Sequence, residues 1–191
     1  NYSIRLFEEQ GVQIKNPNVE NEILDFLKER MRNILKEKNI KNDIIDASIS
    51  SHRGDNYLDL YRKNVLINKN IKKEVLEKII GSYKRASNIL NNADKGISGS
   101  PDAVLFRQDE EKALFEKINE IRKDFTVKDD KKNYENLLFQ MSEIKPFTDN
   151  FFDKVKVNDE NQNIKNNRLE LLKMFCNTFN NFINFSKLEG L

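Results

Sequence analysis

The 191-residue sequence contains only one cysteine and one histidine, which leaves little chemistry for a metal centre or a redox site. His52 has no second histidine or cysteine with which to share a metal ion, so the sequence predicts no metal site. Cys176 lies among regularly spaced apolar residues. It is predicted to be a reduced core residue rather than a nucleophile or a metal ligand.

Long apolar runs are also missing. No stretch approaches the roughly 20 apolar residues of a membrane helix, and the chain does not begin with the basic-then-apolar pattern of a secretory signal. Apolar residues make up 38% and charged residues 34% of the sequence, and the mean hydropathy is −0.74. This balance predicts a folded polar protein with no membrane span, and nothing indicates export. Because the sequence begins at Asn1, inside a segment that looks structured, we expect it to be part of a longer protein.

Catalytic motifs are absent as well. The sequence has no glycine-rich phosphate loop and no nucleophile beside a base. The acidic pairs Glu8–Glu9, Glu110–Glu111 and Asp129–Asp130 are interpreted as solvated helix starts and turns. We therefore predict no catalytic residue in this segment, and any enzymatic chemistry of a parent protein would lie outside it. The formal net charge is only +2, so binding of nucleic acid would have to come from local basic clusters.

The clearest pattern that is present lies near the C-terminus. Apolar residues at helical spacing predict one buried stripe: Leu172, Phe175, Cys176, Phe179, Phe182 and Ile183. So much aromatic area on one helix face must be covered, and we expect helices around 71–90, 109–121 and 131–144 to cover it. The polar residues of the same helix are expected to face water or a partner: Arg168, Lys173, Asn177, Asn180 and Asn184.

Helical periodicity also runs through the rest of the chain. It predicts helices at 17–38, 42–49, 55–65, 69–93, 109–121, 131–144 and 147–155. No stretch shows the alternation of a strand, so the sequence predicts an all-α fold of about seven to nine helices with short connections. Residues 91–102, which contain glycine and proline, form the clearest break and are either a boundary or a loop.

Two basic clusters lie beside the apolar stripes. The first contains Lys84, Arg85 and Asn88, and the second contains Lys154, Lys156, Lys165 and Arg168 with asparagines between them. Such clusters can be solvated helix faces. Arg85 and Arg168 could instead be internal ion-pair partners of Asp153. In a complex with RNA, the basic side chains would accept phosphates, and asparagine and arginine would read exposed base edges.

Four stretches of the chain resemble, in this order, the C-terminal region of the bacterial-type glycyl-tRNA synthetase beta subunit. They are SYKRASNIL (82–90), DEEKALFEKI (109–118), PFTDNFFDKVKVNDENQNIKNNRLELLKMF (146–175) and NFINFSKL (181–188). The family's Phe-Phe-Asp-x-Val pattern falls on 151–155, and its Asn-Arg-Leu-x-Leu-Leu pattern falls on 167–172. Asn184 stands where the family commonly has aspartate. The stretches before residue 80, such as LDFLKERMRNILKEKN (24–39), are looser matches.

The resemblance implies a helical anticodon-binding bundle over residues 81–191, similar to the one in class I arginyl-tRNA synthetases. A helical connecting segment over residues 1–80 would precede it. The bundle would recognise the anticodon end of tRNA(Gly). Polarity and motif position together select the expected tRNA contacts, which are Lys84, Arg85, Asn88, Lys154 and Arg168.

The resemblance also implies a parent enzyme, a glycine–tRNA ligase of the cytoplasm. That enzyme would use ATP with Mg²⁺ and glycine at an active site in the alpha subunit, in a hetero-tetramer of two alpha and two beta subunits. This segment would hold no cofactor itself.

Two alternatives stay open. A helical protein–protein interaction module with no nucleic-acid role would also present polar helix faces. A segment whose site is completed by missing neighbours would bind nothing tightly in isolation.

Overall fold

Helices are the only regular structure in the residues that the computed structural model describes, which are 2–52, 56–70, 74–93, 99–126 and 134–188. The predicted all-α fold is confirmed for this part of the chain. The α-helices are α1 (Tyr2–Glu9), α2 (Val19–Glu37), α3 (Asn42–Ser51), α4 (Tyr57–Asn70), α5 (Glu74–Asn91), α6 (Asp109–Thr126), α7 (Tyr134–Ser142), α8 (Lys145–Lys154) and α9 (Gln162–Asn180). Two short 3-10 helices, η1 (Ala103–Leu105) and η2 (Phe185–Lys187), complete the described elements.

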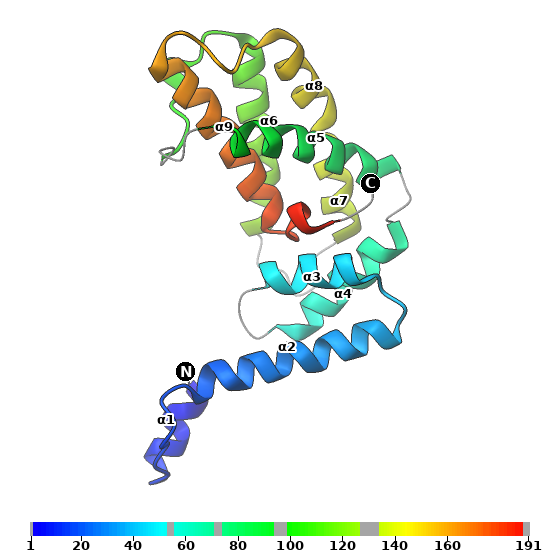
Figure 1. The fold of residues 1–191 in the computed structure, drawn as a ribbon, viewed down its shortest axis with the longest axis vertical. Coiled ribbons are helices and arrows are strands. Elements are labelled where there is room, and N and C mark those ends of the chain that lie inside the picture. The colour runs from blue at the N-terminus through cyan, green and yellow to red at the C-terminus, as the bar shows by residue number, and fades with distance from the viewer. Residues whose placement is uncertain (1, 53–55, 71–73, 94–98, 127–133, 189–191) are drawn as a thin grey trace.

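Helix α9 forms the centre of the C-terminal bundle and packs against both α5 and α6, while α7 and α8 pack on α5 and α6 (Figure 1). Its apolar stripe is buried, and the rings of Phe175 and Phe179 lie 4.5 Å apart between centroids. Burying one such side chain contributes about 1.5–3 kcal/mol. The predicted cover by α5 and α6 is confirmed. Helix α7 reaches the stripe through Tyr134, whose ring centroid lies 5.9 Å from that of Phe182.

The end of α9 differs from the predicted stripe. The helix ends at Asn180, although Phe182 and Ile183 beyond it are still buried. Asparagine side chains compete with the helical backbone for hydrogen bonds at this point. The side-chain oxygen of Asn180 accepts from the backbone N–H of Phe185 at 3.2 Å, which turns the chain back on itself. The continuous helical spacing therefore covers a helix followed by a turn and η2.

The boundary between α4 and α5 also differs from the prediction. Lys69 and Asn70, which we expected to open the long amphipathic helix, close α4 instead. The Asn70 side chain donates to the carbonyl of Leu66 at 2.8 Å, and in doing so competes with the helical backbone at the end of α4. The described part of the next helix begins at Glu74.

The N-terminal helices join the bundle through α3. Helix α3 packs on α4 and on η2, and the backbone N–H of Asn184 donates to the carbonyl of Ala47 at 3.0 Å. Helices α1 and α2 lie at the end of the molecule opposite α6 and α8 (Figure 1). They leave apolar side chains exposed, among them Phe7 and Phe26. Of the helices in the described ranges, none is long and apolar enough to cross a membrane.

Candidate nucleic-acid interface

Three of the predicted contacts lie on the exposed face of α5. Lys84, Arg85 and Asn88 are all exposed, and their spacing puts them within about 100° of one another around the helix. The buried side of the same helix carries Tyr83 and Ala86, which pack into the core. The helix thus presents two cations and an amide from a rigid support.

Arg85 is held against the end of α8. Its guanidinium lies 4.5 Å from the ring centroid of Phe152 and 3.8 Å from a carboxylate oxygen of Asp153. The ion pair of Arg85 with Asp153, which the alternative interpretation allowed, is present, but on the surface rather than inside the protein. Both side chains remain at least half exposed, and an exposed ion pair of this kind contributes only about 0–1 kcal/mol. Arg85 can exchange this partner for a phosphate at little cost, while Phe152 keeps the guanidinium in place.

Lys154 is the last residue of α8, and it remains 61% exposed although it binds Glu110 at 2.7 Å. The hydrogen bond raises the pKa of Lys154 and lowers the pKa of Glu110, so both groups stay charged at neutral pH. Lys156, which follows in the loop, is exposed, and Lys165 is half-buried. Arg85 and the exposed Lys154 and Lys156 therefore lie at the C-terminal end of α8 and in the loop that follows it.

Arg168 corrects the sequence analysis. The expectation that it faces water or a partner is wrong, because its side chain is only 5% exposed. Its Nε donates to Glu111 at 2.9 Å, and one terminal nitrogen donates to Asp159 at 2.8 Å and to the carbonyl of Lys156 at 2.9 Å. It is an internal ion-pair partner, as the alternative interpretation allowed, but of Glu111 and Asp159 rather than Asp153. Its buried position disfavours a direct tRNA contact.

Glu111 is the functional neighbour that the sequence analysis missed. We interpreted it as a solvated helix start, yet its side chain is fully buried. One carboxylate oxygen accepts from the backbone N–H groups of Arg107 and Gln108, both at 2.8 Å, and the other accepts from Arg168. A glutamate three residues after the N-cap commonly accepts from the N-cap backbone in this way. Because Gln108 is not one of the Ser, Thr, Asp or Asn residues of that pattern, the sequence carried only half of the signal. The pair Asp129–Asp130 lies outside the described residues.

The loop between α8 and α9 is fixed by this network. A hydrogen bond from the backbone N–H of Asn161 lowers the pKa of Asp159, and the bond from Arg168 acts in the same direction. Because Arg168 also binds the Lys156 carbonyl, it holds the backbone of the loop that carries this exposed lysine. The buried arginine thus supports the basic surface from below.

The described residues hold no group of three or more histidine, cysteine, aspartate or glutamate side chains that could bind a metal ion. Cys176 is buried, as predicted, and burial raises the pKa of its thiol to about 12. A thiol with this pKa is unreactive at neutral pH.

Comparison with known proteins gives two results. Residues 79–189 match the family described as the DALR anticodon binding domain. The chain is also similar to curated glycine–tRNA ligase beta subunits, which confirms the resemblance inferred from the motifs. It is 33% identical over 189 residues to the protein from Sulfurihydrogenibium sp., covering 98% of this chain and 27% of that protein.

Two further relatives carry the same name. The protein from Persephonella marina is 34% identical over 167 residues, which cover 87% of this chain and 23% of the relative. The protein from Rickettsia africae is 32% identical over 188 residues, which cover 98% of this chain and 26% of that relative. The chain thus spans about a quarter of the length of these curated relatives.

Proposed function

Because the chain belongs to the DALR anticodon binding domain family, we propose that it recognises the anticodon end of a tRNA, and that this tRNA is tRNA(Gly). The observation that carries the proposal is the family match over residues 79–189, whose first helix presents Lys84, Arg85 and Asn88 to solvent. The identity of the tRNA follows from the relatives, which are named glycine–tRNA ligase beta subunits. An anticodon loop exposes unstacked bases, which proteins read by stacking and by edge hydrogen bonds.

The proposal divides the chain into a helical connecting segment, 1–80, and an anticodon-binding bundle, 81–191. The start of the family match at residue 79 supports a boundary near this point. Helix α5 runs across the boundary, so the two parts are joined by a helix that packs on α9 rather than by a free linker.

The proposed tRNA contacts are Lys84, Arg85, Asn88 and Lys154. The lysines and Arg85 neutralise phosphates, and Asn88 reaches a base or a sugar. Arg168 acts indirectly, because its bonds to Glu111 and Asp159 hold the loop after α8 in place. Arg85 pairs with the exposed Asp153 and Lys154 pairs with the partly buried Glu110. These ion pairs weaken the attraction of both cations for phosphate, which favours moderate affinity and release.

The parent protein, on this proposal, is the beta subunit of a cytoplasmic glycine–tRNA ligase. Its alpha subunit would carry the active site that uses ATP, Mg²⁺ and glycine, and the enzyme would be a hetero-tetramer of two alpha and two beta subunits. The described part of this chain would bind tRNA and perform no aminoacylation.

The test is the salt dependence of tRNA binding in a matched pair of variants. Lys154→Ala removes a lysine at the C-terminal end of α8 that binds Glu110, and Lys145→Ala removes one at the other end of α8 that binds Asp149 at 2.6 Å. Loss of one phosphate contact should lower the slope of log affinity against log salt by about 1 in Lys154→Ala only. Equal slopes in the two variants would remove Lys154 from the interface.

A protein–protein interaction module is the second candidate function. The observation that favours it is the apolar surface of α1 and α2, where Phe7, Ile23 and Phe26 are 53%, 52% and 64% exposed. Binding of a protein through this surface would be insensitive to salt and abolished by Phe26→Ser. Binding of tRNA should be unchanged in the same variant.

A further inference from the structure

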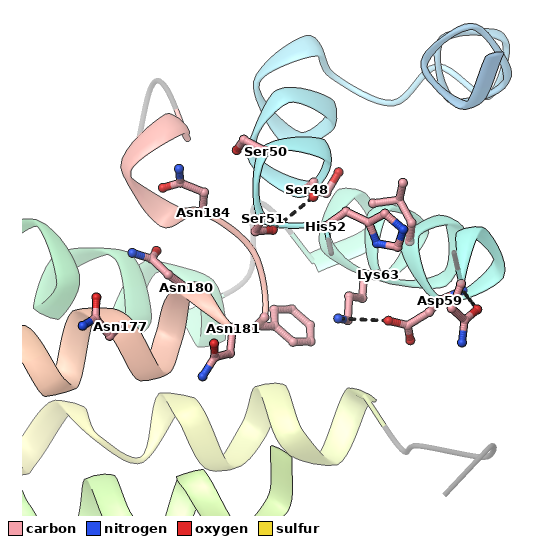
Figure 2. A pocket seen from close by; sticks show the side chains of 13 residues that line it. Ser48, Ser50, Ser51, His52, Asp59, Lys63, Asn177, Asn180, Asn181 and Asn184 are labelled. Carbon is pink, nitrogen blue, oxygen red and sulfur yellow. Dashed lines mark hydrogen bonds and ion pairs between the residues drawn. The ribbon is translucent and has the colours of Figure 1, made fainter. Parts of the chain in front are cut away.

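A polar pocket of about 610 Å³ lies where the N-terminal helices meet the bundle (Figure 2). Its walls come from the C-terminal end of α3, the first turns of α4, and the C-terminal end of α9 with the turn that follows it. Serines of α3 line one side, and four asparagines line the other: Asn177, Asn180, Asn181 and Asn184. The residues before 79 lie outside the family match, so the family does not define this pocket.

The lining is polar and close to electrically neutral. Its lysine, Lys63, binds Asp59 at 3.1 Å, and the ammonium also lies 5.7 Å from the ring centroid of Phe182. A phosphate would find no excess positive charge here. The amides and hydroxyls, in contrast, provide both donors and acceptors of hydrogen bonds. This chemistry matches the edge of a nucleobase, which also presents donors and acceptors side by side.

Two of the asparagines shape the pocket. The Asn180 amide donates to the hydroxyl of Tyr83 at 3.0 Å, and its oxygen accepts from the Phe185 backbone. The Asn184 oxygen accepts from the backbone and the hydroxyl of Ser186, and the Asn184 backbone binds α3. Because both side chains are held by the protein, they are structural walls.

The other two asparagines are placed to bind a ligand. Asn177 and Asn181 are exposed and lie four residues apart, one turn along the same face of the helix end. His52 stands across the pocket from them, half-buried, with its ring centroid 5.2 Å from that of Tyr57 (Figure 2). The imidazole packs against Tyr57 and lines the pocket, and an aromatic ring in a pocket wall can stack on a flat base.

We propose that this pocket binds one unpaired nucleobase of an RNA, with Asn177 and Asn181 hydrogen-bonded to the base edge and His52 stacked on the base. The inference rests on the proposed function, since it identifies a base-reading site for the RNA whose phosphates lie on α5. The bond between Asn180 and Tyr83 attaches the wall of the pocket to α5, the helix whose opposite face carries Lys84 and Arg85. The pocket supplies base recognition that the basic cluster on α5 cannot supply alone.

The test uses the ¹⁵N-labelled chain and a single-stranded RNA heptamer with the anticodon-loop sequence of tRNA(Gly). The side-chain amide signals of Asn177 and Asn181 should shift on titration, while that of Asn33, exposed on α2 and outside the pocket and both basic clusters, should not. The double variant Asn177→Ala, Asn181→Ala should bind the heptamer about 5- to 150-fold more weakly, and Asn33→Ala should bind it like the wild type. Asn177→Leu, which keeps the side-chain size and removes the hydrogen-bonding groups without adding charge, should also weaken binding.

The outcomes separate this inference from the proposed function. Shifts at the pocket with no preference for the tRNA(Gly) anticodon would support the pocket and contradict the proposed function. Anticodon-dependent tRNA binding without pocket shifts, and with unchanged affinity in the double variant, would overturn the pocket alone. Absence of both effects would overturn both. Pocket shifts caused by a protein partner and not by the heptamer would also overturn the inference.

Discussion

Removal of Arg168 distinguishes an internal ion pair from a tRNA contact. In Arg168→Met, the methionine fills much of the same space but leaves the fully buried carboxylate of Glu111 without its cation. Glu111 would keep only the two backbone N–H groups at the start of α6. The loop after α8 would also lose the bonds from Arg168 to Asp159 and to the Lys156 carbonyl.

The structure indicates the size of the effect. Removing one partner of a buried ion pair costs about 3–5 kcal/mol, because the other charge stays buried and uncompensated. The control is Arg85→Met, which removes an arginine that is 50% exposed and 3.8 Å from an exposed carboxylate. That change should lower the free energy of unfolding by no more than about 1 kcal/mol. The double variant Arg168→Met, Glu111→Gln removes the buried charge as well and should be more stable than Arg168→Met alone.

Urea unfolding followed by circular dichroism measures the free energy of unfolding of the wild type and of the three variants. Binding of tRNA across a salt series provides the second readout. Arg85→Met should lower the salt slope by about 1 while the stability stays close to that of the wild type. The opposite pattern would refute the reasoning. If Arg168→Met unfolded within about 1 kcal/mol of the wild type and lowered the salt slope, Arg168 would be a phosphate contact rather than a support.

Three further predictions concern the core and the loop. Cys176 should react with a thiol reagent at mildly alkaline pH only when denaturant unfolds the chain, because its pKa is raised to about 12; rapid modification of the native protein would contradict its burial. Phe179→Ala should lower the free energy of unfolding by about 3–5 kcal/mol in urea, whereas Phe139→Ala, at a side chain that is 55% exposed, should change it by about 0.5 kcal/mol or less. The hydrogen bond from Asn161 holds the pKa of Asp159 below its ordinary 3.8, so this carboxylate stabilises the fold above that pH and the stabilisation is lost as the pH falls below it. Urea unfolding should therefore show a weaker acid dependence in Asp159→Asn, and an unchanged dependence would contradict the assignment.

The helices could be predicted from the sequence because burial follows a period of 3.6 residues. Phe175 and Phe179 are in the core as their spacing indicated. The same rule predicts a last helix that is too long. Phe182 and Ile183 are buried, as they would be in a continued helix, but they lie in the turn after Asn180. Hydrogen bonds from asparagine side chains end the helix there, and spacing alone carries no record of them.

The site was less accessible to sequence reasoning. Lys84 and Arg85 lie beside the stripe of α5 and are exposed, although the sequence left open whether Arg85 is a surface cation or an internal ion-pair partner. The burial of Arg168 depends on Glu111, which lies 57 residues earlier on another helix. Which carboxylate meets which arginine is decided by how α6 and α9 pack, and not by any local pattern. The asparagine pocket likewise needs α3 and α9 to come together.

The most direct test of the central claim is equilibrium binding of the 191-residue chain to transcribed tRNA(Gly) and to the same transcript with altered anticodon bases. Both should be measured across a salt series. We predict tighter binding of the unaltered transcript and a loss of affinity as salt rises, because base contacts discriminate and phosphate contacts depend on counterions. Equal affinity for the two transcripts would contradict anticodon recognition, even if both bind.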